Sequence, residues 1–285
     1  MAKYLVNDTS LTAVADAIRT KGGTTGELEF PSGFVSAVEG IQAGGGGSDV
    51  FASVLEGTIT EINDNTLTNL RNHAFYQCKQ LKKATFAKVT RAGQSSFHEC
   101  SELTEINLPA FNGPLANGTF QQCSKLETVN ILKVTTMSSN AFNSCSALKE
   151  INFPDCTMLY AGIISGSGVE KVFFRGLTKV NGSVLGSAKK LVVADLGNLT
   201  NIPGTLTDNS PVLEAVILRS ATVCTLSSAT NNFNKTPLVG VNGVYSGHVY
   251  VPASLISDYQ QATNWATLYA NYPDIFRAIE GSEYE

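Results

Sequence analysis

The sequence predicts a repeat solenoid, and three observations support that fold class. The pattern Phe-x-x-Cys-x-x-Leu occurs four times, beginning at Phe75, Phe97, Phe120 and Phe142. The leucines of these motifs are separated by 22, 23 and 22 residues. Apolar residues stand three and five positions after the leucine, as in a short strand with one buried face. A period in the low twenties with this strand pattern is typical of a leucine-rich repeat solenoid with a parallel β-sheet ladder and short helices or turns.

The period continues after the motif itself fades. Seven leading apolar residues mark seven coils with the full strand pattern: Leu81, Leu103, Leu126, Leu148, Val169, Leu191 and Leu213. Stacked parallel strands lie about 4.8 Å apart, so a ladder of seven spans roughly 30 Å. Residues 50–247 are therefore assigned to the solenoid, with a less regular first coil that shields its open end.

Residues 1–43 are predicted to form a small helical module. Leu11, Val14 and Ile18 are spaced for one helical face, and Pro31 is expected to begin a second helix. Two short amphipathic helices bury little surface, so the module is either a loose appendage or an attachment unit that folds against another subunit. We favour attachment because both apolar faces would otherwise be exposed. The glycine-rich residues 44–49 are expected to be a flexible linker.

Residues 248–285 are predicted to cap the far end of the solenoid. The expected elements are a strand at His248–Pro252, a helix at Ser254–Asn264 and a last strand at Ile275–Ile279. Such an element is needed because the core of the last coil would otherwise face water.

The composition excludes several classes of partner. The formal net charge is −4, with 20 Lys and Arg and no basic cluster. This composition argues against a nucleic acid, which needs concentrated positive charge, and against an anionic membrane surface. No apolar stretch approaches the roughly 20 residues of a membrane helix, so we expect no membrane insertion. The start of the sequence shows no apolar export segment.

The reactive side chains do not form a recognisable catalytic or metal site. The repeated cysteines, Cys78, Cys100, Cys123 and Cys145, are expected to stack in a buried column. A straight column offers neither the facing geometry of a disulfide nor the tetrahedral ligands of zinc. His98 and Cys100 lack a third group that would orient them for nucleophilic catalysis. We therefore predict no catalytic residues, no metal, no cofactor and no enzyme activity.

Two segments resemble known families. The pattern Ala-Phe-x-x-Cys-x-x-Leu-x-x-Ile-x-Phe-Pro at Ala141–Pro154 resembles the BspA-like leucine-rich repeats of bacteria, and His248–Ala253 with Asp258–Trp265 is similar to the ending of many such proteins. Asp8–Gly23 and Leu28–Val38 are similar to N-terminal segments of tail or other structural proteins in phages of Gram-positive gut bacteria. These resemblances imply an interaction scaffold attached to a virion.

The outward positions of the strand ladder give the candidate binding face. They are the second and fourth positions after each leading residue, because the third and fifth are buried. The residues singled out are Asn107, Asn130, Asn152, Phe173, Val193, Asp195 and Ile217. The asparagines could form a ladder of side-chain amides. The later apolar part is either an exposed contact surface or is covered by residues 227–247 or by the C-terminal cap, and the sequence leaves both open.

These observations predict a non-catalytic binding protein, a phage tail-associated or virion adhesin. Residues 1–43 would bind a virion or other protein subunit, and the solenoid would recognise a host-surface protein or glycan. A particle assembled in the host cytoplasm and released by lysis needs no export segment. The alternatives are a bacterial cell-surface adhesin and a purely structural virion component. Whether the chain forms a homo-oligomer stays open.

Overall fold

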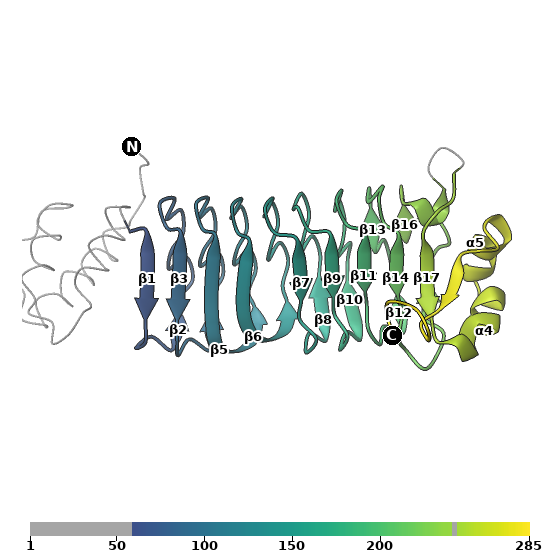
Figure 1. The fold of residues 1–285 in the computed structure, drawn as a ribbon, viewed down its shortest axis with the longest axis horizontal. Helices are drawn as coiled ribbons and strands as arrows, with labels where there is room; N and C mark the ends of the chain where they lie inside the picture. Colours follow the sequence, from purple (N-terminus) through teal and green to yellow (C-terminus); the bar gives the residue numbers. More distant parts are fainter. Residues whose placement is uncertain (1–58, 241–243) are drawn as a thin grey trace, which may run out of the picture. The chain divides into compact units, whose positions relative to one another are not determined.

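The computed structural model describes residues 59–240 and 244–285. The predicted helical module at 1–43 and the linker at 44–49 lie outside the described residues. The described chain is a parallel β-solenoid of about eight turns with a few short helices, which confirms the predicted fold class (Figure 1).

One side of the solenoid is a ladder of short parallel strands. Its first half is formed by β1 (Glu61–Asp64), β3 (Lys83–Phe86) and the first parts of β5 (Glu105–Leu115) and β6 (Thr128–Met137). Its second half is formed by β7 (Glu150–Asn152), β9 (Lys171–Phe173), β11 (Val193–Asp195), β14 (Ala215–Ile217), β17 (His248–Val251) and β18 (Phe276–Ala278). The pairing register places equivalent repeat positions side by side, as the sequence period predicted.

A second set of short strands forms the back of each coil. These strands are β2 (Asn69–Leu70), β4 (Arg91–Ala92), the ends of β5 and β6, β8 (Met158–Tyr160), β10 (Lys179–Asn181), β12 (Asn201–Ile202) and β15 (Thr225–Leu226). In the late coils β13 (Thr207–Asp208) pairs with β16 (Phe233–Asn234). The seven leading residues are all between 0% and 1% exposed, so they form the predicted buried row.

The ladder is interrupted between β6 and β7. Before β3, β5, β6, β9, β11 and β14, the amide of the residue that precedes the strand donates to a carbonyl one coil earlier, as Glu170 does to Lys149 at 2.8 Å. Among the described residues, Lys149 itself makes no such bond, and β6 and β7 are not paired. The same coils stay joined at the back, where β6 pairs with β8, and at the corner, where Phe142 donates to Ile163 at 2.8 Å. The opening is therefore confined to the ladder side.

The corner of each early coil is built on a stacked phenylalanine. The ring centroids of Phe75 and Phe97 lie 5.2 Å apart, those of Phe97 and Phe120 5.4 Å, and those of Phe120 and Phe142 5.3 Å. The rings are nearly parallel, with interplanar angles of 13° to 15°. Each such pair contributes about 0.5–1.5 kcal/mol beyond the burial of its area, so the column resists separation of the coils.

The cysteines of the repeat are buried beside this column. The thiol of Cys100 donates to the Phe75 carbonyl at 3.0 Å, and Cys123 donates to Phe97 in the same way. All six cysteines are free and buried. The predicted column of buried thiols is confirmed. The structure also shows that these thiols donate hydrogen bonds to backbone carbonyls, which an aliphatic side chain of similar size could not do.

The corner also requires two left-handed residues, four positions apart. They are His73 and Gln77 in the first described corner, with φ of 59° and 58°. In the third corner Gly118 and Gln122 take these places, with φ of 60° and 62°. A side chain at such a position crowds its own carbonyl, so only glycine occupies it without cost.

The C-terminal region both covers and extends the solenoid. After the 3-10 turns η1 (Pro237–Val239) and η2 (Ala253–Leu255), the structure has two short helices, α4 (Ile256–Gln261) and α5 (Trp265–Asn271). The single helix predicted at Ser254–Asn264 is therefore wrong in its bounds, and α5 was not predicted. Tyr259 and Trp265 are fully buried, and the Cys224 amide donates to the Tyr259 hydroxyl at 2.9 Å. The two predicted strands are present as β17 and β18, and both continue the ladder in parallel.

Replacing Gln122 by glycine should stabilise the protein. The substitution removes the strain of a side chain at φ 62°, and we expect the free energy of unfolding to rise by about 0.5–1 kcal/mol in chemical denaturation. The matched control is Gln121→Gly, where the backbone is not left-handed and the same change should destabilise by about 0.5–1 kcal/mol. A loss of stability from both variants would contradict this reading of the corner.

The thiols should be unreactive until the protein unfolds. Burial raises the pKa of Cys78 and of Cys224 to about 12 and that of Cys156 to about 11. At about pH 8 the reactive thiolate is then a small minority, and the buried sulfur atoms are shielded from reagent. A thiol-reactive chromophore should react rapidly with no cysteine of the native protein and with all six cysteines after denaturation. One native thiol reacting at the rate of a free cysteine would disagree with the structure.

Candidate binding face

We term the outward side of the ladder the ladder face. It comprises the outward residues of β1, β3, β5, β6, β7, β9, β11 and β14. At the fourth repeat position, Asn107 is paired with Asn130, Asn152 with Phe173, and Phe173 with Asp195. Six of the predicted site residues thus hold the fourth repeat position, and Val193 holds the second, beside Lys171 and Ala215.

The asparagines lie at the surface without forming the expected amide ladder. Asn107 is half-buried, and Asn130 and Asn152 are exposed. Asn130 and Asn152 stand on opposite sides of the interruption between β6 and β7. No side-chain hydrogen bond joins these three residues in the part of the chain that the structure describes. Their amide groups therefore remain available to solvent or to a partner.

The apolar end of the ladder face is covered by the chain itself. Val193, Asp195 and Ile217 are 4%, 1% and 0% exposed. Residues 279–285, here termed the C-terminal tail, fold over them: Ile279 belongs to the same apolar cluster and Tyr284 packs against it. Of the two alternatives that the sequence left open, the structure therefore shows coverage by the C-terminal region, and these three residues are not on the surface.

An arginine fastens the tail to the ladder. Arg219 donates through Nε to the Asp195 carboxylate at 2.9 Å and through Nη2 to the Tyr284 carbonyl at 2.6 Å. The Gly197 amide adds a hydrogen bond to Asp195 at 3.1 Å, and the Tyr284 ring meets Tyr250 edge to face at 4.6 Å. Asp195 thus acts as a buried anchor for the arginine. Sequence reasoning missed Arg219, although an aspartate among apolar outward residues was a signal that a buried cation lies nearby.

The covered region ends at a shallow hollow on the ladder face. This ladder hollow has a volume of about 490 Å³ and is lined by Glu150, Asn152, Pro154, Lys171, Phe173 and Arg175. Phe173 is half-buried, and the side chain of Arg175 is 57% exposed with its Nε 3.8 Å from the Asp195 carboxylate. In the described chain no carboxylate lies within 4.0 Å of the Lys171 ammonium. The hollow therefore combines a partly exposed aromatic ring with two cations and one carboxylate.

Apolar surface continues across the interruption of the ladder. Leu132 is 70% exposed and holds the repeat position that Pro154 holds one coil later. Val129 is half-buried, whereas the equivalent Ile151 is buried. Apolar atoms at the interruption are thus exposed at Leu132 in the first half of the ladder and at Pro154 in the second half.

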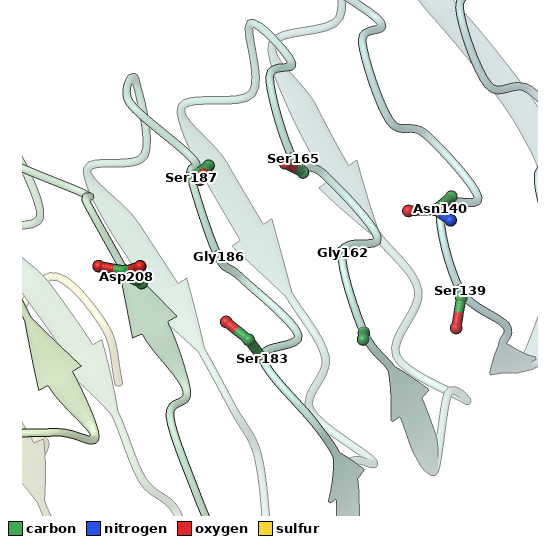
Figure 2. Close-up of a pocket in the computed structure, with 9 residues that line it drawn as sticks. Ser139, Asn140, Gly162, Ser165, Ser183, Gly186, Ser187 and Asp208 are labelled. Carbon is green, nitrogen blue, oxygen red and sulfur yellow. The ribbon is translucent and has the colours of Figure 1, made fainter.

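A second depression lies along the corners of the later coils (Figure 2). This corner trough, of about 400 Å³, is lined by Ser139, Asn140, Ala161, Gly162, Ser165, Ser183, Gly186, Ser187 and Asp208. Figure 2 shows that Asn140, Ser165, Ser187 and Asp208 come from successive coils. Its lining has no aromatic ring and no cation, so it offers fewer means of recognition than the ladder hollow.

The remaining sequence candidates do not form a site. His98 is half-buried and stacks on Tyr76 with ring centroids 5.0 Å apart, whereas the Cys100 thiol is bonded inside the corner. Within residues 59–240 and 244–285 no group of three or more potential metal ligands occurs. In the same residues no helix combines the length and apolar character that crossing a membrane requires.

Loss of Arg219 should cost far more than loss of its neighbour Arg175. Arg219→Met leaves the Asp195 carboxylate buried without its main partner, and we expect the free energy of unfolding to fall by about 3 kcal/mol. Amide exchange in the C-terminal tail should accelerate in the same variant. Arg175→Met is the matched control, because its side chain is mostly exposed and should cost less than about 1 kcal/mol. Equal costs would show that Arg219 does not hold the tail.

Comparisons with known proteins give one family match and several similar structures. Residues 47–171 match the family described as BspA type leucine rich repeat region, in six copies. The chain is similar to the structure of a leucine rich cell surface protein of Faecalibacterium prausnitzii, with 15% identity and a TM-score of 0.40. The similarity covers 60% of this chain and 66% of that protein, which is just under two thirds of its length. It is also similar to a leucine rich repeat protein of T. pallidum, with 14% identity and a TM-score of 0.38 over 68% of this chain and 76% of that one.

No curated protein matches the sequence, and the comparisons do not support the resemblance of the N-terminal segment to phage proteins. The structure continues the same ladder register beyond residue 171, through β11 and β14. The motif at Ala141–Pro154 falls inside the matched range. This chain therefore carries a BspA-type leucine-rich repeat region at residues 47–171.

Proposed function

We propose that this protein is a non-catalytic binding protein whose ladder face recognises a protein or glycan on a host cell surface. The observation that carries the proposal is the ladder hollow, where the half-buried ring of Phe173 stands between Lys171, Arg175 and Glu150. Aromatic and arginine side chains supply much of the energy of binding interfaces when a partner removes them from water. A partly exposed ring with charged neighbours is therefore suited to recognition.

The shape of the site favours a large partner over a small molecule. Small-molecule sites are concave and bury most of their ligand. The ladder hollow is instead formed by outward side chains of neighbouring strands, with Leu132 exposed one coil before Pro154. A partner that spans several coils would cover the asparagines of the first half together with Phe173.

The attachment part of the proposal rests on the sequence alone. Residues 1–43 would dock the protein to a phage particle, as the resemblance of residues 8–23 and 28–38 implies. The same ladder face would serve an adhesin displayed on a bacterial cell. The two locations are separated by an experiment, immunogold labelling of purified particles and of cell-wall fractions from uninfected cells. Label on particles supports the virion adhesin, and label on the uninfected cell wall replaces it by a cell-surface adhesin.

Substitution within the ladder hollow should weaken cell binding. The fluorescently labelled full chain is incubated with a panel of Gram-positive gut bacteria and measured by flow cytometry. We expect saturable binding that Phe173→Ser and Lys171→Ala each reduce by about tenfold. The matched control is Lys179→Ala, because Lys179 belongs to the same coil but lies on the back strand β10 and is also exposed.

Two results would reject the proposed binding face. One is binding that Phe173→Ser and Lys171→Ala leave unchanged while Lys179→Ala reduces it. The other is a complete absence of binding to the whole panel. Unchanged adsorption of phage particles after deletion of residues 50–285 would favour the purely structural alternative.

A further inference from the structure

We infer that the ladder hollow binds a short acidic peptide segment that carries an aromatic side chain, in the way that the ladder face already holds the protein's own C-terminal tail. This inference rests on the proposed function, because it names the class of partner for the same face. It follows from a repeated arrangement of side chains, of which one copy is filled by the chain and the other is open.

The filled copy shows how the ladder face holds a peptide. The tail has the sequence Ile-Glu-Gly-Ser-Glu-Tyr-Glu at residues 279–285. Its Tyr284 packs against the apolar cluster that contains Ile217 and meets Tyr250 edge to face, while its Tyr284 carbonyl accepts a hydrogen bond from Arg219 at 2.6 Å. An apolar outward residue and an arginine two positions later thus bind one aromatic residue and one peptide carbonyl.

The open copy stands two coils earlier in the same register. Phe173 and Arg175 occupy the fourth and sixth positions after their leading residue, as Ile217 and Arg219 do after theirs. Both arginines face the same buried carboxylate: Nη2 of Arg219 lies 2.8 Å and Nε of Arg175 3.8 Å from Oδ2 of Asp195. The hollow therefore repeats the apolar outward residue and the arginine of the tail site, with Asp195 beside Phe173 where Tyr250 stands beside Ile217.

The open copy differs from the filled one in exposure and charge. The side chain of Arg175 is 57% exposed, against 18% for Arg219. Lys171 adds a cation at the repeat position where the filled copy has Ala215. With Glu150 as the one carboxylate among its lining residues, the hollow favours a partner with negative charge. The tail itself has that character, since three of its seven residues are glutamate.

The experiment uses the full chain and a synthetic fluorescent peptide with the sequence of residues 278–285. Fluorescence anisotropy should show saturable binding below about 1 mM peptide. Phe173→Ser and Arg175→Gln should each weaken that binding by about fivefold or more, and alanine in place of the peptide's tyrosine should do the same. Raising the salt to about 0.5 M should also weaken it, because exposed cations contribute.

Controls separate the hollow from general attraction to a charged surface. Arg91→Gln and Lys179→Ala remove cations from exposed back strands and should change binding by less than about twofold. The folding of Phe173→Ser is checked by amide exchange of the ladder strands. Arg175→Gln alters a mostly exposed side chain, so it tests the inference even if Phe173→Ser is unstable.

The inference is overturned if the peptide does not saturate, or if Phe173→Ser and Arg175→Gln leave its affinity unchanged. Whole-cell binding then tells whether the proposed function survives. If periodate treatment of the cells abolishes binding and protease treatment does not, the partner is not a peptide and the inference is overturned. The ladder face then keeps its proposed role as a glycan receptor. Binding that protease abolishes, with the same dependence on Arg175, supports the inference.

Discussion

The structure depends on the alignment of each coil with the next, which one row of leading residues and one stack of rings enforce together. No coil can bury its own apolar side chains, so each is stable only against its neighbours. The leading residues from Leu81 to Leu213 are sealed from water, and Phe75, Phe97, Phe120 and Phe142 stack at the corner. The hydrogen bonds that the Cys100 and Cys123 thiols donate to backbone carbonyls stabilise the corner within the core.

This alignment also creates the proposed binding surface. When the coils are in register, outward residues fall into columns, and a column can change character along its length without disturbing the core. The column at the fourth repeat position carries Asn107, Asn130 and Asn152, reaches the half-buried Phe173 and then passes under the C-terminal tail at Asp195 and Ile217. Arg219 and Arg175 stand on either side of Asp195, and only Arg219 is committed to the tail.

The sequence was sufficient to predict the structural features that depend on the repeat period. It predicted the buried row, the thiol column, the ladder register and the outward positions of Asn152 and Phe173, because these follow from counting residues within one coil. It could not predict the covering of Val193 and Ile217, because the bond from Arg219 to Tyr284 joins residues 65 positions apart in different elements. The missing pairing between β6 and β7 was likewise invisible, since their motifs keep a regular spacing.

The central claim is that the open part of the ladder face, at Phe173, is where a partner touches the protein. Photo-crosslinking tests it most directly, with a benzophenone amino acid placed at Phe173 in one variant and at Lys179 on the back of the same coil in another. The account predicts covalent capture of a cell-surface component from position 173 and not from position 179. Capture from position 179 alone would contradict it.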